Sequence, residues 1–447
     1  MSALAIPGHP DLAGKAPRNL GDAACLIVPA LAFLRVDLGG VIFATDVCLL
    51  LVLLLLVAKR PSMFQNRTVQ KVCLLGLAWL AAQILSDVIQ GTPSEQYIRG
   101  WSKISLTITH LMAVALLIRG SWKRLMLYGV GLALGGLLTF FLAPGDYAIS
   151  VPWKFGLGIP VTMLVCVIAG SIAKKRKASA VVVMLLMGCL NIYLGFRSVG
   201  GICLAVPVFV HARLTYRTSK RRAVVLGSIA TLFGAWAITA GYSYAATEGW
   251  LGEQARQTYL SQSAGEGGIL LGGRSDVIAA AAAIIDSPVV GHGSWARDPK
   301  YAALEADRRA AMGYRYTGSL KDQDLIPSHS HLLGAWVEAG VMGAVFWAWI
   351  LGLTVKSLAR ASGTEPLFPF IVFVAFLLIW NVFFSPYGAE MRFLNTYSIY
   401  AVIALGRLSK GGIFRPNHVQ NIHSYYLFQS RGVPGADDSV RVGAEGG

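Results

Sequence analysis

The chain has 447 residues, of which 55% are hydrophobic and only 14% are charged, whereas soluble proteins carry roughly 25% charged residues. This composition excludes a disordered chain and argues against a soluble multidomain protein, because the apolar residues come in runs of about twenty. The formal net charge of +16 indicates either a nucleic-acid partner or the basic cytoplasmic loops of a membrane protein.

The first 21 residues are polar and contain no apolar run before a small-residue cleavage site. We therefore expect a cytoplasmic N-terminal segment rather than a cleaved signal peptide. The cysteines all fall in apolar runs without CxxC spacing, which predicts packing residues and neither a disulfide set nor a metal site. They are Cys25, Cys48, Cys73, Cys166, Cys189 and Cys203.

Twelve segments are apolar and long enough to cross a bilayer as helices, a crossing that needs about 20 residues. They run approximately over residues 22–36, 39–58, 70–89, 102–118, 122–142, 153–173, 179–194, 199–212, 223–246, 329–355, 366–385 and 391–406. The sequence thus predicts an all-α polytopic membrane protein of about twelve spans. The exact count depends on two short segments, 22–36 and 199–212.

The basic residues decide the orientation. With a cytoplasmic N-terminus, 25 of the 39 Lys and Arg residues lie inside, six lie in the short outside loops and eight in one long outside loop. This is the asymmetry of the positive-inside rule. It accounts for the net charge without a nucleic-acid partner and predicts that both termini are cytoplasmic.

The long outside loop covers residues 247–328. It follows spans one to nine, in residues 22–246, and precedes spans ten to twelve, in residues 329–406. Within it, Ser275 precedes an Ala-rich run that ends at Pro288, which predicts a capped helix. Residues 301–312 predict a second helix. The segment 407–447, rich in Gly, Pro, Asp and Ser, predicts a poorly ordered cytoplasmic tail.

Two arginines are candidates for binding an anion. Arg197 lies on the very short outside turn between spans seven and eight, where it could clamp an anion or extend to lipid phosphates. Arg274 precedes Ser275 at the start of the loop helix, where backbone N–H groups and a guanidinium suit a phosphate. The Gly-Gly-Arg sequence at 272–274 is also a common turn.

A third candidate is the turn at residues 291–297. Its glycines, Gly293 among them, would let the backbone approach a ligand, His292 lies between them, and Trp295 offers a face for a sugar ring. An ordinary surface turn is the alternative.

The most informative segment is residues 327–343, where the long loop enters span ten. Ser328 or Ser330 could cap the helix, and His329 and His331 then stand at its outer end, able to move protons. Glu338 lies inside the apolar run, where a carboxylate is costly and implies function or a buried network. A helix that includes His331 places Glu338 on the same face about two turns deeper, supporting the packing or His331 rather than His329.

Four other acidic residues have both a functional and an ordinary structural interpretation. Asp322 and Asp324 resemble the pair that holds a metal and a sugar nucleotide in cytosolic glycosyltransferases. The predicted compartment lacks nucleotide sugars, so we expect no metal here. Asp46 and Asp87, in or near apolar spans, suggest either a proton path or packing positions.

The order of these motifs, over residues 180–355, resembles the O-antigen ligase and O-antigen polymerase superfamily of polytopic membrane glycosyltransferases. The most specific element is a His with a Glu nine positions later and glycines at eleven and fourteen; it is matched by His329, Glu338, Gly340 and Gly343. The family usually has Asn directly after the His. Here Ser330 and then His331 follow, which leaves open which imidazole is central.

The resemblance implies a bacterial inner-membrane enzyme with a C-type glycosyltransferase fold and a periplasmic loop. Its donor would be an undecaprenyl-diphosphate-linked glycan, and its acceptor a lipid A-core or a lipid-linked glycan hydroxyl, as in lipopolysaccharide or exopolysaccharide synthesis. Arg197 and Arg274 would stabilise the diphosphate, and His329, or else His331, would take the acceptor proton in an inverting displacement without metal or cofactor. Substrate contacts would come from His292, Gly293, Trp295 and Glu338.

A different class of protein, a twelve-span secondary transporter or flippase of a polar or anionic solute, is the alternative. Such proteins usually show paired halves and a site at the bilayer midplane. Here the polar candidates gather at the outer surface beside an off-centre loop, which favours glycan transfer. The sequence does not separate a ligase from a polymerase.

Overall fold

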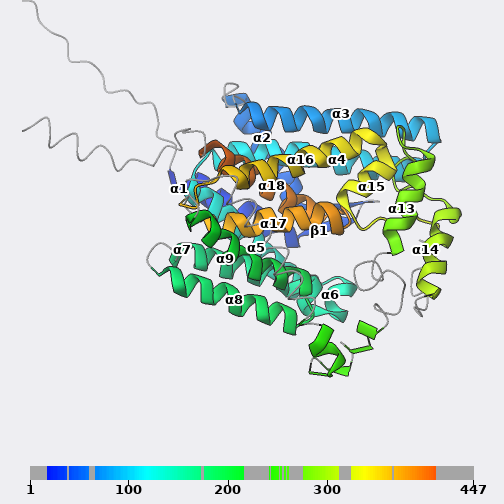
Figure 1. The fold of residues 1–447 in the computed structure, drawn as a ribbon. Helices are drawn as coiled ribbons and strands as arrows, with labels where there is room; N and C mark the ends of the chain where they lie inside the picture. The colour runs from blue at the N-terminus through cyan, green and yellow to red at the C-terminus, as the bar shows by residue number, and fades with distance from the viewer. Residues whose placement is uncertain are drawn as a thin grey trace, which may run out of the picture. The chain divides into compact units, whose positions relative to one another are not determined.

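The computed structural model describes residues 18–37, 40–59, 66–172, 176–215, 241, 243–250, 252–253, 256–257, 259–260, 275–311, 324–364 and 367–408. Long helices run along a common axis, and two helices of the long loop, α13 and α14, lie across one end of the bundle (Figure 1). We call this end, where β1 and α6 also lie, the outer end.

The first half of the bundle contains α1 (Arg18–Ala30), η1 (Leu31–Phe33), β1 (Arg35–Asp37), β2 (Val41–Phe43), α2 (Ala44–Lys59), α3 (Arg67–Gln90), α4 (Ser94–Ile118), α5 (Trp122–Leu142), α6 (Asp146–Ser150), η3 (Trp153–Leu157), α7 (Gly158–Ile172), α8 (Lys177–Tyr193) and α9 (Arg197–Thr215). The second half contains α13 (Ser275–Asp286), α14 (Pro299–Ala311), α15 (His331–Ala339), α16 (Val341–Arg360), α17 (Phe368–Phe384) and α18 (Met391–Leu408).

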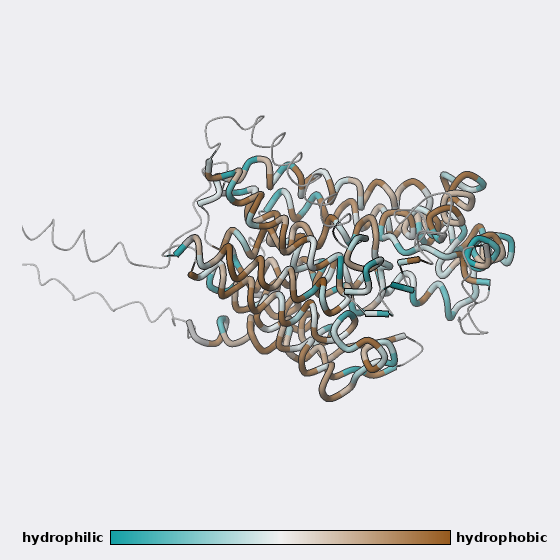
Figure 2. The backbone as a smooth tube through the Cα atoms, turned by 60° about the horizontal axis from the view of Figure 1, so that its bottom comes forward, coloured by the Kyte–Doolittle hydropathy of each residue, from teal (hydrophilic) through white to brown (hydrophobic). Residues whose placement is uncertain are grey.

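The helices have the length and composition of membrane spans. Among the described residues, six are long and apolar enough to cross a bilayer: α3, α4, α5, η3 with α7, α9 and α16. Shorter apolar helices cover 20–33, 44–57, 178–193 and 368–384. Hydrophobic residues dominate along the bundle (Figure 2), and Leu74 and Leu85 of α3 are exposed on its side, as lipid-facing residues are. The chain is thus a multi-pass, all-α membrane protein.

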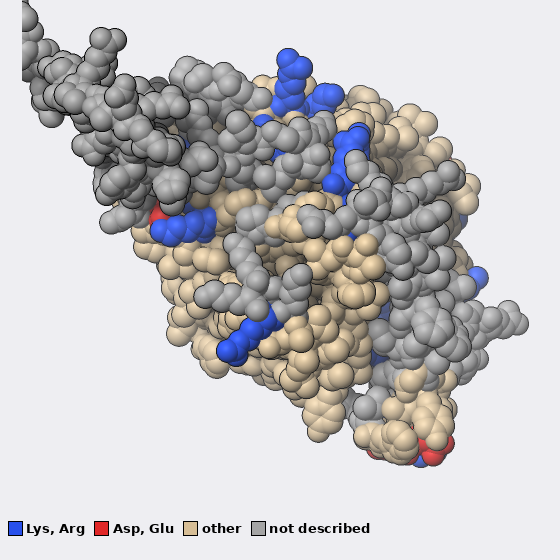
Figure 3. Space-filling view, turned by 60° about the vertical axis from the view of Figure 1, so that its left-hand side comes forward, with Lys and Arg blue, Asp and Glu red and all other residues tan. Residues whose placement is uncertain are grey.

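Eleven of the twelve predicted spans coincide with helices of the described part. The ninth, 223–246, lies almost wholly outside the described residues, so the count of twelve stays a prediction. The predicted tail lies outside them from residue 409 onward. Among the described residues on the face that Figure 3 shows, Lys and Arg are more prominent than Asp and Glu.

A short hairpin that the hydropathy pattern did not predict joins α1 to α2. Strands β1 and β2 pair antiparallel, with Arg35 opposite Phe43 and Asp37 opposite Val41. The hairpin brings Arg35 back to the outer end of the bundle, beside the start of α18.

The predicted tenth span is wrong in one respect: residues 329–355 do not form one helix. Gly340, with φ 63° and ψ −158°, separates α15 from α16. The ring centroids of His331 and Trp347 are 4.8 Å apart, whereas a continuous helix would hold these residues about 24 Å apart. A Cβ on Gly343 would meet the Ala335 carbonyl oxygen. Helix α15 therefore folds back along the first turns of α16.

Both helices predicted in the long loop are present, as α13 and α14. They form a second, smaller apolar core with α15, in which alanines of α13 contact Tyr301 of α14 and Val337 of α15. At its edge, the Asp286 carboxylate accepts hydrogen bonds from Lys300 Nζ and Tyr301 Oη, both at 2.5 Å. The hydrogen bond from the Lys300 ammonium is the main cause that lowers the pKa of Asp286. The loop helices are thus fixed against α15.

Candidate functional site

The two histidines of residues 329–331 have opposite environments, and His329 is the accessible one. Its side chain is 53% exposed, and its Nδ1 lies 3.4 Å from Oδ2 of Asp276 in α13. The same carboxylate oxygen accepts the His329 backbone N–H at 2.9 Å. Asp276 is buried. A buried carboxylate that holds Nδ1 orients the ring and leaves Nε2 as the nitrogen that can exchange a proton.

His331 is fully buried and both its ring nitrogens are engaged. Nδ1 donates to the Ser385 carbonyl at 2.6 Å, and Nε2 accepts from Asn395 Nδ2 at 2.8 Å. Asn381 bonds Asn395 at 3.4 Å and accepts from Ser385 Oγ at 2.9 Å. The four residues form a closed network, through the backbone carbonyl and the hydroxyl of Ser385, that joins α15, the end of α17 and α18, and the network assigns the neutral Nδ1–H tautomer. This geometry favours His329 as the residue that meets a substrate.

Ser330, between the two histidines, explains why α15 begins there. Its Oγ accepts the Leu333 N–H at 3.1 Å as the helix N-cap and donates to the Val382 carbonyl at 2.8 Å. Of the two predicted caps, Ser330 therefore caps the helix. This anchor holds the start of α15 against the end of α17.

Glu338 lies two turns along the same helix as His331, as the sequence predicted, but it is not the deeper of the two residues. Because α15 folds back, His331 lies beside Trp347 in the second turn of α16, and Glu338 lies near the turn where α16 begins. The Glu338 carboxylate pairs with Lys103 of α4 at 2.5 Å, and the side chains are 16% and 12% exposed. The costly carboxylate is thus offset by a lysine 235 positions away in the chain.

The turn at residues 291–297 holds the carboxyl end of α15. The backbone N–H of His292 donates to the Val337 carbonyl at 2.7 Å, and that of Gly293 to the Glu338 carbonyl at 3.1 Å and to Ser86 Oγ at 3.0 Å. His292 Nε2 bonds the Ala283 carbonyl oxygen at 2.8 Å. These groups, predicted to contact substrate, are hydrogen-bonded within the protein.

Trp295, in the same turn, stays accessible. It has a positive φ of 52° and is 37% exposed, and the Arg99 guanidinium lies 5.9 Å from its ring centroid. Of the predicted contacts in this turn, Trp295 retains a face that a sugar ring could contact.

Asp87 organises the turn from α3. One carboxylate oxygen accepts the Ser294 backbone N–H at 2.5 Å, and the other accepts Ser294 Oγ and Trp101 Nε1, each at 2.7 Å. These bonds make Asp87 a packing residue, which was one of its two predicted roles. Asp324 of the predicted acidic pair bonds Arg297 at 2.5 Å, and Asp322 lies outside the described residues.

The predicted anion-binding arginines are only partly described. Arg197 begins α9 directly after the short turn that follows α8, as predicted, and it is half-buried near Lys154. Arg274 lies outside the described residues; in the sequence it precedes α13 by one position and Asp276 by two.

Asp46, which the sequence analysis named, belongs to a buried charged cluster inside the bundle, and the two partners in that cluster were not predicted. Asp46 of α2 lies 2.9 Å from His110 Nε2 of α4 and 2.9 Å from Arg392 Nη2 of α18. All three are buried, and within the described part of the chain His110 Nδ1 and Arg392 Nε have no hydrogen-bond partner. His110 is 64 positions from Asp46 and Arg392 is 346 positions from it, so no local pattern could reveal the cluster.

No protein family model, curated protein or solved structure matches this chain.

Proposed function

We propose that this protein is a membrane glycosyltransferase that moves a glycan from an undecaprenyl-diphosphate-linked donor to an acceptor hydroxyl at the periplasmic face. The acceptor is a lipid A-core or a growing lipid-linked glycan, as in an O-antigen ligase or polymerase. The protein then lies in a bacterial inner membrane with both termini cytoplasmic and needs no metal.

The reaction is a single displacement with inversion. His329 Nε2 takes the proton of the acceptor hydroxyl as its oxygen bonds to the anomeric carbon. The bond from that carbon to the diphosphate oxygen breaks, and its electron pair leaves with the lipid diphosphate. Arg197 and Arg274 stabilise the developing charge, and Trp295 contacts the sugar.

The observation that carries the proposal is the pairing of His329 with Asp276. An exposed imidazole whose Nδ1 faces a buried carboxylate is the arrangement that a general base needs. It combines residues from two segments, 275–286 and 324–330, the first of which directly follows the candidate Arg274 in the sequence. Because His331 is enclosed by its own hydrogen bonds, one imidazole is left for the chemistry.

A second candidate function, secondary transport of a polar or anionic solute, is favoured by the cluster of Asp46, His110 and Arg392. Ionisable residues buried among spans often belong to proton or ion pathways. In this alternative, His329 and Asp276 have no role in turnover, and substitution at Asp46 abolishes uptake.

The test uses purified protein reconstituted into liposomes with a labelled lipid-linked oligosaccharide, with and without a lipid A-core acceptor. Longer lipid-linked chains identify a polymerase, and label on the core identifies a ligase. Arg274→Ala should abolish either product and leave the protein in the membrane. Solute uptake without transfer of label would favour the transporter instead.

A further inference from the structure

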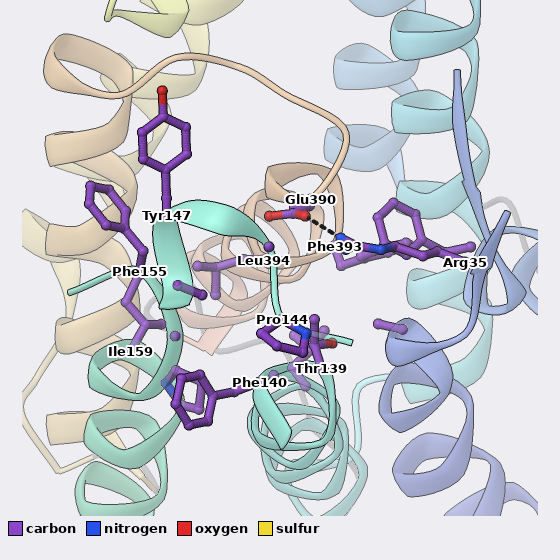
Figure 4. A pocket seen from close by; sticks show the side chains of 18 of the residues that line it. Arg35, Thr139, Phe140, Pro144, Tyr147, Phe155, Ile159, Glu390, Phe393 and Leu394 are labelled. Carbon is purple, nitrogen blue, oxygen red and sulfur yellow. Dashed lines mark hydrogen bonds and ion pairs between the residues drawn. The ribbon is translucent and has the colours of Figure 1, made fainter. Parts of the chain in front are cut away.

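A cavity of about 350 Å³ opens at the outer end between η1, α5, α6, η3 with α7, and the start of α18 (Figure 4). Its size lies at the lower end of the range for small-ligand pockets. Its inner wall is apolar and includes Leu132 and Gly136 of α5, Ile159 and Met163 of α7, and Leu394 of α18. Leu132 lies ten residues before the end of α5, so the cavity reaches about 15 Å into the bundle.

Charged and aromatic residues surround the mouth. Arg35 Nη1 pairs with Glu390 Oε1 at 3.1 Å, and Arg35 Nη2 bonds the Ala143 carbonyl at 3.3 Å. Asp146 and the rings of Tyr147 and Phe155 complete the rim. An apolar interior with a charged rim suits an apolar chain that carries a polar head, and it suits a free sugar poorly.

The pair of Arg35 and Glu390 can be exchanged for a bound anion. The Glu390 side chain is 69% exposed and that of Arg35 is 30% exposed, and such surface ion pairs contribute little to stability. A guanidinium binds a phosphate through two parallel hydrogen bonds, which are stronger. A phosphate at the mouth can therefore displace Glu390, although Asp146 repels it.

A second basic residue, Lys154, lies next to the lining of the cavity. Phe155 lines the cavity, and the Lys154 ammonium lies 4.9 Å from its ring centroid. Arg35 in the lining and Lys154 beside Phe155 thus place positive charge at this cavity.

We propose that this cavity holds the first units of the polyisoprenoid chain of the lipid-linked donor, with Arg35 bonded to its diphosphate. This inference rests on the proposed function. The apolar depth receives the chain, and the arginine at the mouth receives the phosphate. A bilayer phospholipid offers similar chemistry and is an outcome that the test must separate.

The test measures binding and transfer in parallel. Undecaprenyl diphosphate with a photoreactive group near its head is crosslinked to reconstituted wild-type protein, and the labelled peptides are mapped. Ile159→Trp fills the cavity, and Ile168→Trp on the same helix, at an exposed position, is the matched control. Arg35→Ala and Arg35→Lys probe the mouth without filling the core.

We expect labels on the peptides of α5 and α7 that line the cavity, with Ile159→Trp and Arg35→Ala each weakening labelling about tenfold or more. Arg35→Lys should retain part of the wild-type labelling, and Ile168→Trp should retain all of it. Unchanged labelling in Ile159→Trp and Arg35→Ala would overturn the lipid site even if the wild type transfers glycan. Equal competition by phosphatidylglycerol would overturn the donor assignment. Cavity labelling in a protein without transfer would instead contradict the proposed function and leave the lipid site standing.

Discussion

Asp276 and His329 lie 53 positions apart in the chain, yet one carboxylate oxygen of Asp276 accepts the backbone N–H of His329 at 2.9 Å and lies 3.4 Å from its ring Nδ1. The aspartate comes from α13 and the histidine from the segment that enters α15. Packing of α13 against α15 through the small apolar core keeps this pair together. The orientation of the imidazole therefore depends on the loop helices as well as on the bundle.

Asp276→Asn should lower kcat for glycan transfer about tenfold to hundredfold, with KM for the donor little changed. The amide can still accept the backbone N–H, but it cannot stabilise the imidazolium that forms during proton transfer. Initial rates measured over a range of donor concentrations separate the two constants.

The matched control is Asp286→Asn, which removes a carboxylate from the same helix where it pairs with Lys300. It should leave kcat unchanged. Equal loss in both variants would show that α13 acts only as a scaffold, and a rise in KM alone would contradict the positioning role of Asp276.

His331→Ala should destabilise the protein rather than remove a catalytic group. The substitution leaves the Ser385 carbonyl and the Asn395 amide without their partner. Each buried group without a partner lowers the unfolding free energy by about 1–3 kcal/mol. Thermal unfolding in detergent should therefore begin at a lower temperature. An unfolding temperature equal to that of the wild type, together with lost transfer, would make His331 the catalytic base instead.

Gly340→Ala should disrupt the turn between α15 and α16. A Cβ at Gly340 would meet the Val289 carbonyl oxygen, and the residue has a φ of 63°, a strain of about 1–3 kcal/mol for other residues. Limited proteolysis and thermal unfolding of the purified variant would measure the effect.

Gly352→Ala, in the same helix α16, supplies the comparison. Nothing lies within 4 Å of a Cβ there, so alanine should stabilise the helix by up to about 1 kcal/mol. If both variants unfolded alike, the turn at Gly340 would not be the determinant that we infer.

The sequence revealed the spans well because hydropathy is a local property. Apolar runs predicted helices over eleven segments that the structure describes, and the Ala-rich run after Ser275 and the segment 301–312 predicted α13 and α14. The break at Gly340 was missed because a glycine in an apolar run is equally typical of close helix packing. The break at Gly340 goes together with hydrogen bonds from the backbone N–H groups of His292 and Gly293 to carbonyl groups at the end of α15.

The sequence was enough to predict which residues belong to the candidate site. It was not enough to predict which of them contact one another. The pattern around His329 and Glu338 was visible, but their partners, Asp276 and Lys103, are 53 and 235 positions away. A single sequence does not record such contacts. His331 and Glu338 do lie seven positions apart in one helix, as predicted, but the expectation that Glu338 is the deeper residue failed because it assumed that this helix continues straight into α16.

Lys103→Met and Glu338→Met should each destabilise the protein, because each leaves a partly buried charge without its partner. The double variant should lose less unfolding free energy than the two single variants lose together, and the difference, the coupling energy, should be about 0.5–3 kcal/mol. A double-mutant cycle of unfolding in detergent gives this coupling. Strictly additive losses would mean that the ion pair contributes nothing.

The central claim is that His329 is the base of a glycan transfer, and the most direct measurement compares transfer by wild type, His329→Ala and His211→Ala in the same liposomes. His211 is an exposed histidine near the end of α9 and controls for the loss of an imidazole. We predict that His329→Ala lowers the transfer rate about 10²- to 10⁴-fold while His211→Ala retains it. Wild-type transfer that persists in His329→Ala would contradict the account.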